Sequence, residues 1–365
     1  MADGGTPTPP PLALAATYPR ADVHTHVDER LLPVVFQILG RVGVERIVNL
    51  SGGTAGEELQ RSLALSRRYG GRVLTCVNVT WDHAASPGFG VRMAGDLEAA
   101  VSMGASCLKV PKGLGLGIRL PGEGFLAVDD VRLAPLWDAA GRLRIPVLIH
   151  VGDPAAFWLP VTPQNERYDE LVIHPAWSFA DPRYPARGVL LHQFEALLAR
   201  HRATTFVGVH FGNDPEDIAA TDARMVAHPN LWIDTAARVP EIGRGRPERL
   251  RAFFVKHQDR VLFGTDLGVT GGGVMLGSGD GTEPGWPEIT RFFDLHWRFF
   301  EGAEQAIPHP TPIQGRWAVN AIALPPEVLR KFYLVNAVRL FRWPTLKPVT
   351  PGALDWPPPG PAGVP

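Results

Sequence analysis

The sequence predicts a (β/α)8 barrel with a C-terminal helical extension. Eight short apolar runs alternate with segments of helical periodicity between about residues 20 and 266. The runs are almost continuously apolar, which is typical of parallel strands covered on both faces. Ligand-type residues end several of these runs, and a barrel brings the carboxyl ends of all its strands to one mouth. An open doubly wound sheet is the alternative, but it does not easily gather so many strand ends.

The expected elements have readable boundaries along the chain. Two of the helices end at glycines, the Gly70-Gly71 pair and Gly104, and a long connection at 151–187 follows the fifth strand. The strands are expected at 21–26, 46–50, 73–79, 106–110, 145–150, 205–210, 231–234 and 260–266, and the helices between them at 31–43, 57–69, 93–103, 131–143, 189–200, 215–227 and 247–257.

The region after the eighth strand is expected to complete one large domain. A Gly-rich loop at 268–285 looks like a mobile lid, and helical runs at 287–301 and 326–341 follow it. The barrel domain is therefore expected to span residues 20–343. Residues 1–19 resemble a disordered Pro-rich lead rather than a signal peptide, and 344–365 form a Pro-rich tail.

Composition excludes several classes of partner. The chain has 36 basic and 37 acidic residues and a net charge of -1, so we expect no nucleic-acid or membrane-surface partner. Cys76 and Cys107 lie in apolar runs and are predicted to be small buried hydrophobes in a reducing compartment, without a disulfide. A small-molecule substrate and a cytoplasmic location are expected, and a homodimer is left open.

The first strand carries the sequence Asp-Val-His-Thr-His at 22–26. His24 and His26 are two residues apart, so on a strand both side chains point to the same face. Two imidazoles at the end of a strand make half of a metal site. An H-x-H pattern also arises by chance, but ligand-type residues at the ends of later strands support the metal-site interpretation.

The chain carries the motifs DVHTH at 22–26, PVLIHVGDP at 146–154, FVGVHFGN at 206–213, RVLFGTD at 260–266 and NAVRLF at 336–341. With these motifs it resembles the amidohydrolase superfamily. The resemblance is to the branch related to the aminocarboxymuconate-semialdehyde decarboxylases, and within it to a poorly characterised subgroup.

The resemblance implies one divalent metal, with zinc as the expected ion, held by His24, His26, His150 and Asp266. Neutral imidazoles with a carboxylate suit zinc, which lowers the pKa of a bound water. Asp266 would also take the proton of that water, and His210 would act as a general acid or base. The alternative for His210 is a core histidine with a satisfied hydrogen bond.

Three basic residues are candidates for further roles. Lys109 ends the fourth strand, where two-metal members of the superfamily carry a carbamylated lysine that bridges both metals; binding a substrate carboxylate or reaching solvent are the alternatives. Lys112 is a second candidate for a substrate carboxylate. Arg238, after the seventh strand, is predicted to face an anionic substrate or to anchor the mouth by pairing with a carboxylate.

Other conspicuous residues have plainer explanations. The glycines at 113–117 are not followed by a helix, so no dinucleotide cofactor is expected. The aromatic residues Phe157, Trp158, Trp177 and Phe179 either roof a pocket or pack the long connection against the barrel. The remaining histidines are expected mostly at the surface: His83, His174, His192, His201, His228, His257, His296 and His309.

The sequence therefore predicts a metal-dependent hydrolase of a small ester, lactone or amide. Non-oxidative decarboxylation of a small acid is the first alternative, because the same ligand set serves both reactions. A barrel that has lost activity and acts as a binding module is the second, and the intact ligand set argues against it.

Overall fold

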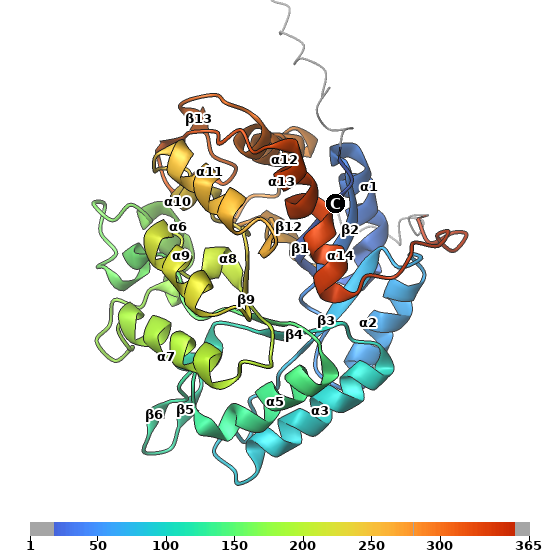
Figure 1. Ribbon diagram of the computed structural model, residues 1–365, viewed down its shortest axis with the longest axis vertical. Coiled ribbons are helices and arrows are strands. Elements are labelled where there is room, and N and C mark those ends of the chain that lie inside the picture. The colour runs from blue at the N-terminus through green and yellow to red at the C-terminus, as the bar shows by residue number, and fades with distance from the viewer. Residues whose placement is uncertain (1–17, 280, 355–365) are drawn as a thin grey trace, which may run out of the picture.

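A computed structural model describes residues 18–279 and 281–354, and these form the predicted barrel (Figure 1). Eight parallel strands follow one another around it, and the chain from Phe263 to Asp266 closes the ring: Val23 N donates to Phe263 O (3.0 Å) and Asp266 N to His24 O (2.9 Å). The barrel strands are β1 (Arg20–Val27), β2 (Val44–Asn49), β3 (Val73–Asn78), β4 (Cys107–Val110), β7 (Val147–Ile149), β8 (Phe206–Gly208), β9 (Leu231–Asp234) and β10 (Val261–Leu262).

Helices surround the strands, as the periodicity predicted. In the first of them, Leu32, Val35 and Leu39 are buried at helical spacing, and Gly43 ends the helix with a left-handed φ of 75°. The outer helices are α1 (Leu32–Val42), α2 (Glu57–Arg67), α3 (Phe89–Met103), α5 (Ala134–Leu143), α7 (Arg187–Arg200), α9 (Ile218–Ala227), α11 (Pro247–Lys256) and α12 (Trp286–Glu301). The run expected at 326–341 consists of α13 (Pro326–Arg330), a π-helical turn (Lys331–Val335) and α14 (Asn336–Phe341).

The apolar core lies in two layers because strand side chains alternate between faces. Leu108 and Val110 face the helices, whereas Cys107 belongs to the cluster that fills the barrel interior. Trp343 belongs to this inner cluster, and its indole donates to Gly71 O (2.6 Å) just before β3. Trp343 therefore covers the amino-terminal end of the barrel, and the opposite end is left for the strand-end residues.

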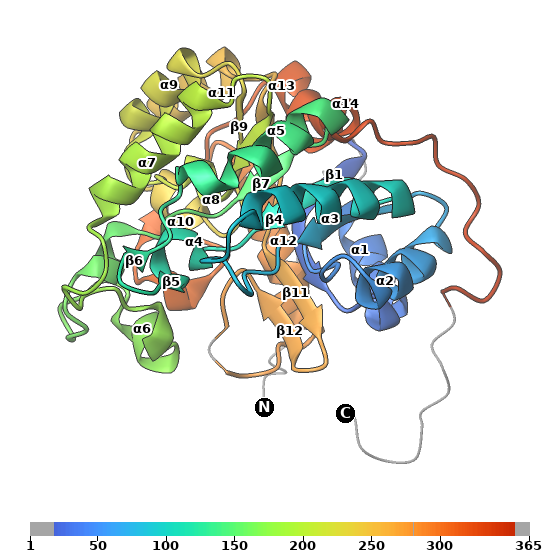
Figure 2. The same cartoon turned by 90° about the horizontal axis from the view of Figure 1, so that it is seen from below.

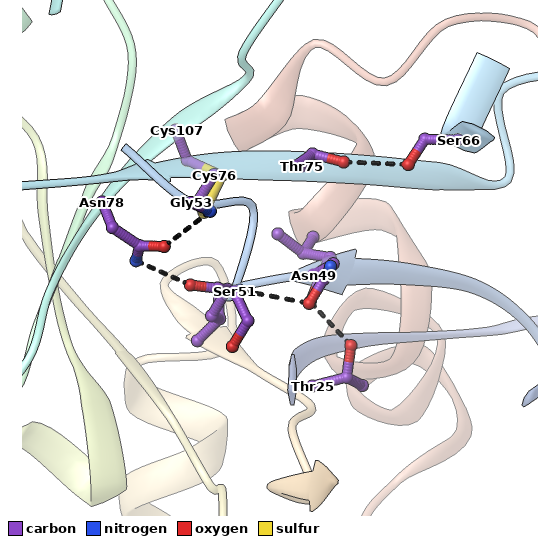
Figure 3. The surroundings of a disulfide bond; sticks show 11 residues. Thr25, Asn49, Ser51, Gly53, Ser66, Thr75, Cys76, Asn78 and Cys107 are labelled. Atoms are coloured by element: carbon purple, nitrogen blue, oxygen red, sulfur yellow. Dashed lines mark hydrogen bonds between the residues drawn. A yellow bond between two sulfur atoms is a disulfide. The ribbon is translucent and has the colours of Figure 1, made fainter. Parts of the chain in front are cut away.

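The prediction for the two cysteines is wrong about pairing and right about burial. Cys76 and Cys107 are fully buried, lie opposite each other in the register of β3 and β4, and form a disulfide (Figure 3). Both side chains face the barrel interior, which brings together residues 31 positions apart. Strand register, which sequence periodicity does not report, decides this contact.

The region between β10 and α12 also differs from the prediction. Part of the expected Gly-rich loop is a hairpin, in which β11 (Leu267–Thr270) pairs with β12 (Gly273–Leu276) and β11 runs parallel to β1. The eighth barrel strand is accordingly shorter than expected. In Figure 2 this hairpin lies on the same side of the molecule as α6 (Tyr168–Ile173), a short helix within the long connection.

The expected terminal segments lie mainly outside the described residues, which begin at 18 and end at 354. The described part of the tail runs along the surface beside α2, where Lys347 N donates to Gly70 O and Thr350 N to Arg68 O (2.8 Å each). Within residues 18–279 and 281–354, no helix has the length and apolar character needed to cross a membrane.

Half of the histidines expected at the surface are buried instead. His296 Nδ1 is 2.8 Å from Phe292 O, and His257 Nε2 is 2.6 Å from Asp222 Oδ1. His201 and His309 are buried in the same way, each with a hydrogen-bonding partner. A local acceptor makes burial of a neutral imidazole tolerable, and the sequence does not show where such acceptors lie.

Candidate metal centre

The two histidines of β1 point to the same place, as expected from their spacing. His24 is fully buried and His26 is partly exposed, and their ring centres lie 5.4 Å apart. His24 Nδ1 is 2.8 Å from Asp234 Oδ2, and His26 Nδ1 is 2.8 Å from Ser51 Oγ. The Nε2 atoms of the two rings lie 3.4 and 3.5 Å from Asp266 Oδ1. Asp266 Oδ1 therefore lies between the two imidazoles, and the Nδ1 atom of each ring has a hydrogen-bonding partner on the other side.

The end of β8 makes a left-handed turn that carries His210. The φ angles of His210, Phe211, Gly212 and Asn213 are 54°, 60°, 72° and 62°. His210 N donates to Asp234 Oδ1 (2.8 Å), and its Nδ1 lies 2.9 Å from Ala236 O. Asp266 also has a left-handed φ, 66°. Left-handed backbone at non-glycine residues costs about 1–2 kcal/mol each, and such strain concentrates at functional sites.

Donor atoms of His24, His210 and Asp266 lie within 4.8 Å of one another, which is close enough to hold a metal ion. His150, expected among the ligands, lies beside this group, with its ring centre 4.4 Å from that of His210. Its Nε2, however, is 3.2 Å from Asp153 Oδ1. The structure thus brings all five predicted residues to one mouth: His24, His210 and Asp266 form the compact group, and His26 and His150 lie beside it.

Burial sets the protonation of the four imidazoles. It lowers the pKa of His24, His26, His150 and His210 below the usual value, most strongly for His24 and His210. Neutral imidazole is the form that binds a metal. His24 Nε2 is moreover buried without a hydrogen-bond partner among the described residues. His24 Nε2 and the nearby Asp266 carboxylate therefore offer the kind of donor atoms that bind a divalent cation.

Lys109 faces the same centre from β4. It is 4% exposed, and burial lowers its pKa to about 8 although Asp234 and Asp266 oppose the shift. Its register partner on β3 is Asn78, whose side chain is hydrogen-bonded to Gly53 N and Leu50 O (Figure 3). Lys109 therefore lies inside the barrel, above the disulfide, and does not reach solvent as the alternative for a strand-end lysine supposed.

Lys112 and Arg238 converge on one carboxylate, that of Asp153. Lys112 Nζ lies 3.0 Å from Asp153 Oδ2, and Arg238 Nη2 lies 3.4 Å from Oδ1. Burial alone would raise the pKa of Asp153, but Lys112, His150 and Arg238 together hold it well below the usual range. Of the two roles predicted for Arg238, pairing with a carboxylate is the one observed. Aromatic rings of the long connection pack around Lys112, namely Phe157, Trp177 and Phe179.

A family model described as amidohydrolase matches residues 16–343. The chain belongs to the amidohydrolase family. This superfamily consists of metal-dependent enzymes, so the family and the donor set point to the same kind of site. No curated protein matches the chain.

Solved structures show that this amidohydrolase shares its fold with distant relatives. A 4-oxalomesaconate hydratase from Rhodopseudomonas palustris is 15% identical, with a TM-score of 0.52 over 88% of this chain and 95% of that one. A putative amidohydrolase from Staphylococcus aureus is 11% identical, with a TM-score of 0.51 over 89% and 99%. An uncharacterised TIM-barrel protein from Bordetella bronchiseptica is 14% identical, with a TM-score of 0.50 over the same shares.

Two residues of the amidohydrolase centre were not singled out from the sequence. Asp234 holds both the ring of His24 and the backbone of His210, and Asp153 holds His150. Both were visible as acidic residues at or just after a strand end, in LWID at 231–234 and in IHVGD at 149–153. Their position was therefore a usable signal, but their partners depend on neighbouring strands.

Proposed function

We propose that this amidohydrolase is a metal-dependent hydrolase that cleaves a small ester, lactone or amide with metal-activated water. The observation that carries the proposal is the convergence of His24 Nε2, His26 Nε2 and Asp266 Oδ1, with separations of 3.4 and 3.5 Å from the carboxylate oxygen. His150 completes the proposed ligand set, and zinc is the proposed ion because imidazole and carboxylate are its common ligands. When bound, the ion would supply a water of lowered pKa.

The proton-handling residues follow from the hydrogen bonds. Ala236 O can only accept, so His210 Nδ1 carries the proton and its Nε2 is free to exchange one with substrate. Asp266 is partly exposed at the mouth, where its carboxylate can accept a proton from the attacking water. We therefore propose that Asp266 takes the proton of the attacking water and that His210 Nε2, unprotonated at rest, relays a proton from Asp266 to the leaving group.

Non-oxidative decarboxylation of a small acid is the second candidate. The buried ammonium of Lys109 favours it, because a cation inside the centre is suited to a substrate carboxylate. In that reaction His210 or Asp266 would deliver the proton that replaces the lost carboxylate. Screening lactones, amides and aromatic acids by product mass distinguishes the two: hydrolysis adds the mass of water, whereas decarboxylation removes that of carbon dioxide.

The metal-site proposal is tested by the double variant His24→Ala/His26→Ala. We expect it to purify without the metal that the wild-type protein carries, while its circular dichroism spectrum is retained. His192→Ala is the matched control, because His192 is exposed on the outer helix α7 and is not a strand-end residue. Full metal retention in the double variant, measured by elemental analysis, would refute the site.

A further inference from the structure

Asp153 is a buried carboxylate on which three basic side chains converge. It is 2% exposed, and its oxygens lie 3.2 Å from His150 Nε2, 3.0 Å from Lys112 Nζ and 3.4 Å from Arg238 Nη2. A carboxylate paired with Lys112 and Arg238 is ionised, and an ionised carboxylate only accepts hydrogen bonds. The proton in the contact with His150 therefore lies on Nε2.

This arrangement distinguishes His150 from the two neighbouring imidazoles of the centre. His24 and His210 direct Nδ1 at acceptors, Asp234 Oδ2 and Ala236 O, so their Nε2 atoms carry the free lone pair. His150 is held through the opposite nitrogen. Its free lone pair lies on Nδ1, although its ring packs directly against that of His210.

We propose that Asp153 is a positioning residue that holds His150 by Nε2, so that His150 serves the centre through Nδ1. The proposal rests on the proposed function, in which His150 is a ligand. It also assigns a role to Lys112 and Arg238: they orient Asp153, which removes them from the set of groups free to bind substrate.

The backbone around Asp153 is fixed as firmly as its side chain. Asn213 Oδ1 accepts from Val151 N at 2.7 Å, and Arg187 Nε donates to Asp153 O at 2.9 Å. Asn213 belongs to the left-handed turn that carries His210, so the same turn fixes both histidines. Lys112 Nζ lies 4.7 Å from the ring centre of Trp177, so this contact joins the long connection to the cluster around Asp153.

The test compares Asp153→Asn with Glu301→Gln. Glu301 also carries a buried, paired carboxylate, 2.7 Å from Arg20 Nη2 and 2.9 Å from the Tyr333 hydroxyl, but it touches neither the candidate ligands nor the residues around Asp153. Long-range proton–nitrogen NMR of the metal-free protein, assigned with a His150→Gln variant, reports the tautomer of His150. Zinc affinity is measured separately by competition with a chromophoric chelator.

We expect the wild-type His150 to be protonated at Nε2 and the Asp153→Asn ring to become a mixture of tautomers, because an amide can donate as well as accept. Loss of an outer-shell partner weakens metal binding about 10–100-fold. Glu301→Gln should stay within about threefold of the wild type on the same scale.

A wild-type His150 protonated at Nδ1 overturns the proposal, as does an Asp153→Asn variant with unchanged tautomer and zinc affinity. The wild-type tautomer decides the matter even where the substitution prevents folding. A wild-type protein that binds no zinc refutes the proposed function instead, and the tautomer of the metal-free protein still tests the role of Asp153.

Discussion

Replacing Asp234 by asparagine should weaken the metal centre while leaving the barrel folded. Asp234 Oδ2 accepts from His24 Nδ1 and Oδ1 accepts from His210 N, each at 2.8 Å. An asparagine retains one acceptor and presents an NH2 group to the other donor. If the amide oxygen keeps His210 N, the ring of His24 must move its proton to Nε2, the nitrogen that faces Asp266.

The size of the effect follows from the bond that is lost. A hydrogen bond to a charged group contributes about 1.5–3 kcal/mol, and loss of an outer-shell partner weakens metal binding about 10–100-fold. Since tenfold corresponds to about 1.4 kcal/mol, the two ranges agree. We expect zinc affinity to fall within that range, with the unfolding transition still cooperative.

The assay is a zinc titration against a chromophoric chelator, with Glu301→Gln as the control. Both variants change a buried carboxylate to an amide, but only Asp234 touches His24. A zinc affinity within twofold of the wild type in Asp234→Asn would refute the reasoning. So would an equal loss in both variants, because that would trace the effect to general destabilisation.

Three further predictions concern metal count, pH and the disulfide. With added bicarbonate we expect close to one metal per chain; a value near two that drops to one in Lys109→Ala would mean a carbamylated bridge and would make His210 a ligand. Burial lowers the pKa of His296 to about 4 against 6.5 in the unfolded chain, so the unfolded state binds more protons between these values and the unfolding free energy falls as pH drops from 6.5 to 4. His296→Leu should show a smaller fall in urea denaturation, and equal pH slopes would contradict this. Removing both Cys76 and Cys107 by alanine should cost about 3–4 kcal/mol of unfolding free energy, the loop-closure value for their separation of 31 residues, and reductant should no longer affect unfolding. Two titratable thiols in the unreduced wild-type protein would refute that disulfide.

The architecture was predictable because apolar periodicity reports which face of each element is buried. The barrel then followed from chain order, and with it the meeting of His24, His150 and His210 at one mouth. What periodicity omits is the register between strands. Register pairs Cys76 with Cys107 and brings Asp234 to His24, contacts that join residues 31 and 210 positions apart.

Protonation and orientation were also beyond the sequence. H-x-H spacing places two imidazoles on one face, but it does not say which ring nitrogen points inward. That choice depends on the acceptor behind each ring, an Asp234 oxygen for His24 and an Asp153 oxygen for His150. The positive charge of Arg238 likewise suggested a substrate anion or a carboxylate partner equally well until Asp153 was located beside it.

The backbone around His210 and Asp266 is strained, and hydrogen bonds with side chains such as Asp234 hold it in place. His210, Phe211 and Asp266 each hold a left-handed φ, at about 1–2 kcal/mol per residue, a sum comparable with a good part of the stability of an ordinary domain. Such conformations persist only where neighbouring contacts determine them. Asp234 holds the start of the turn at His210 N, and Asn213 holds its end against the strand that carries His150. The protein's own hydrogen bonds therefore bring the donor atoms together, which supports the proposed metal site.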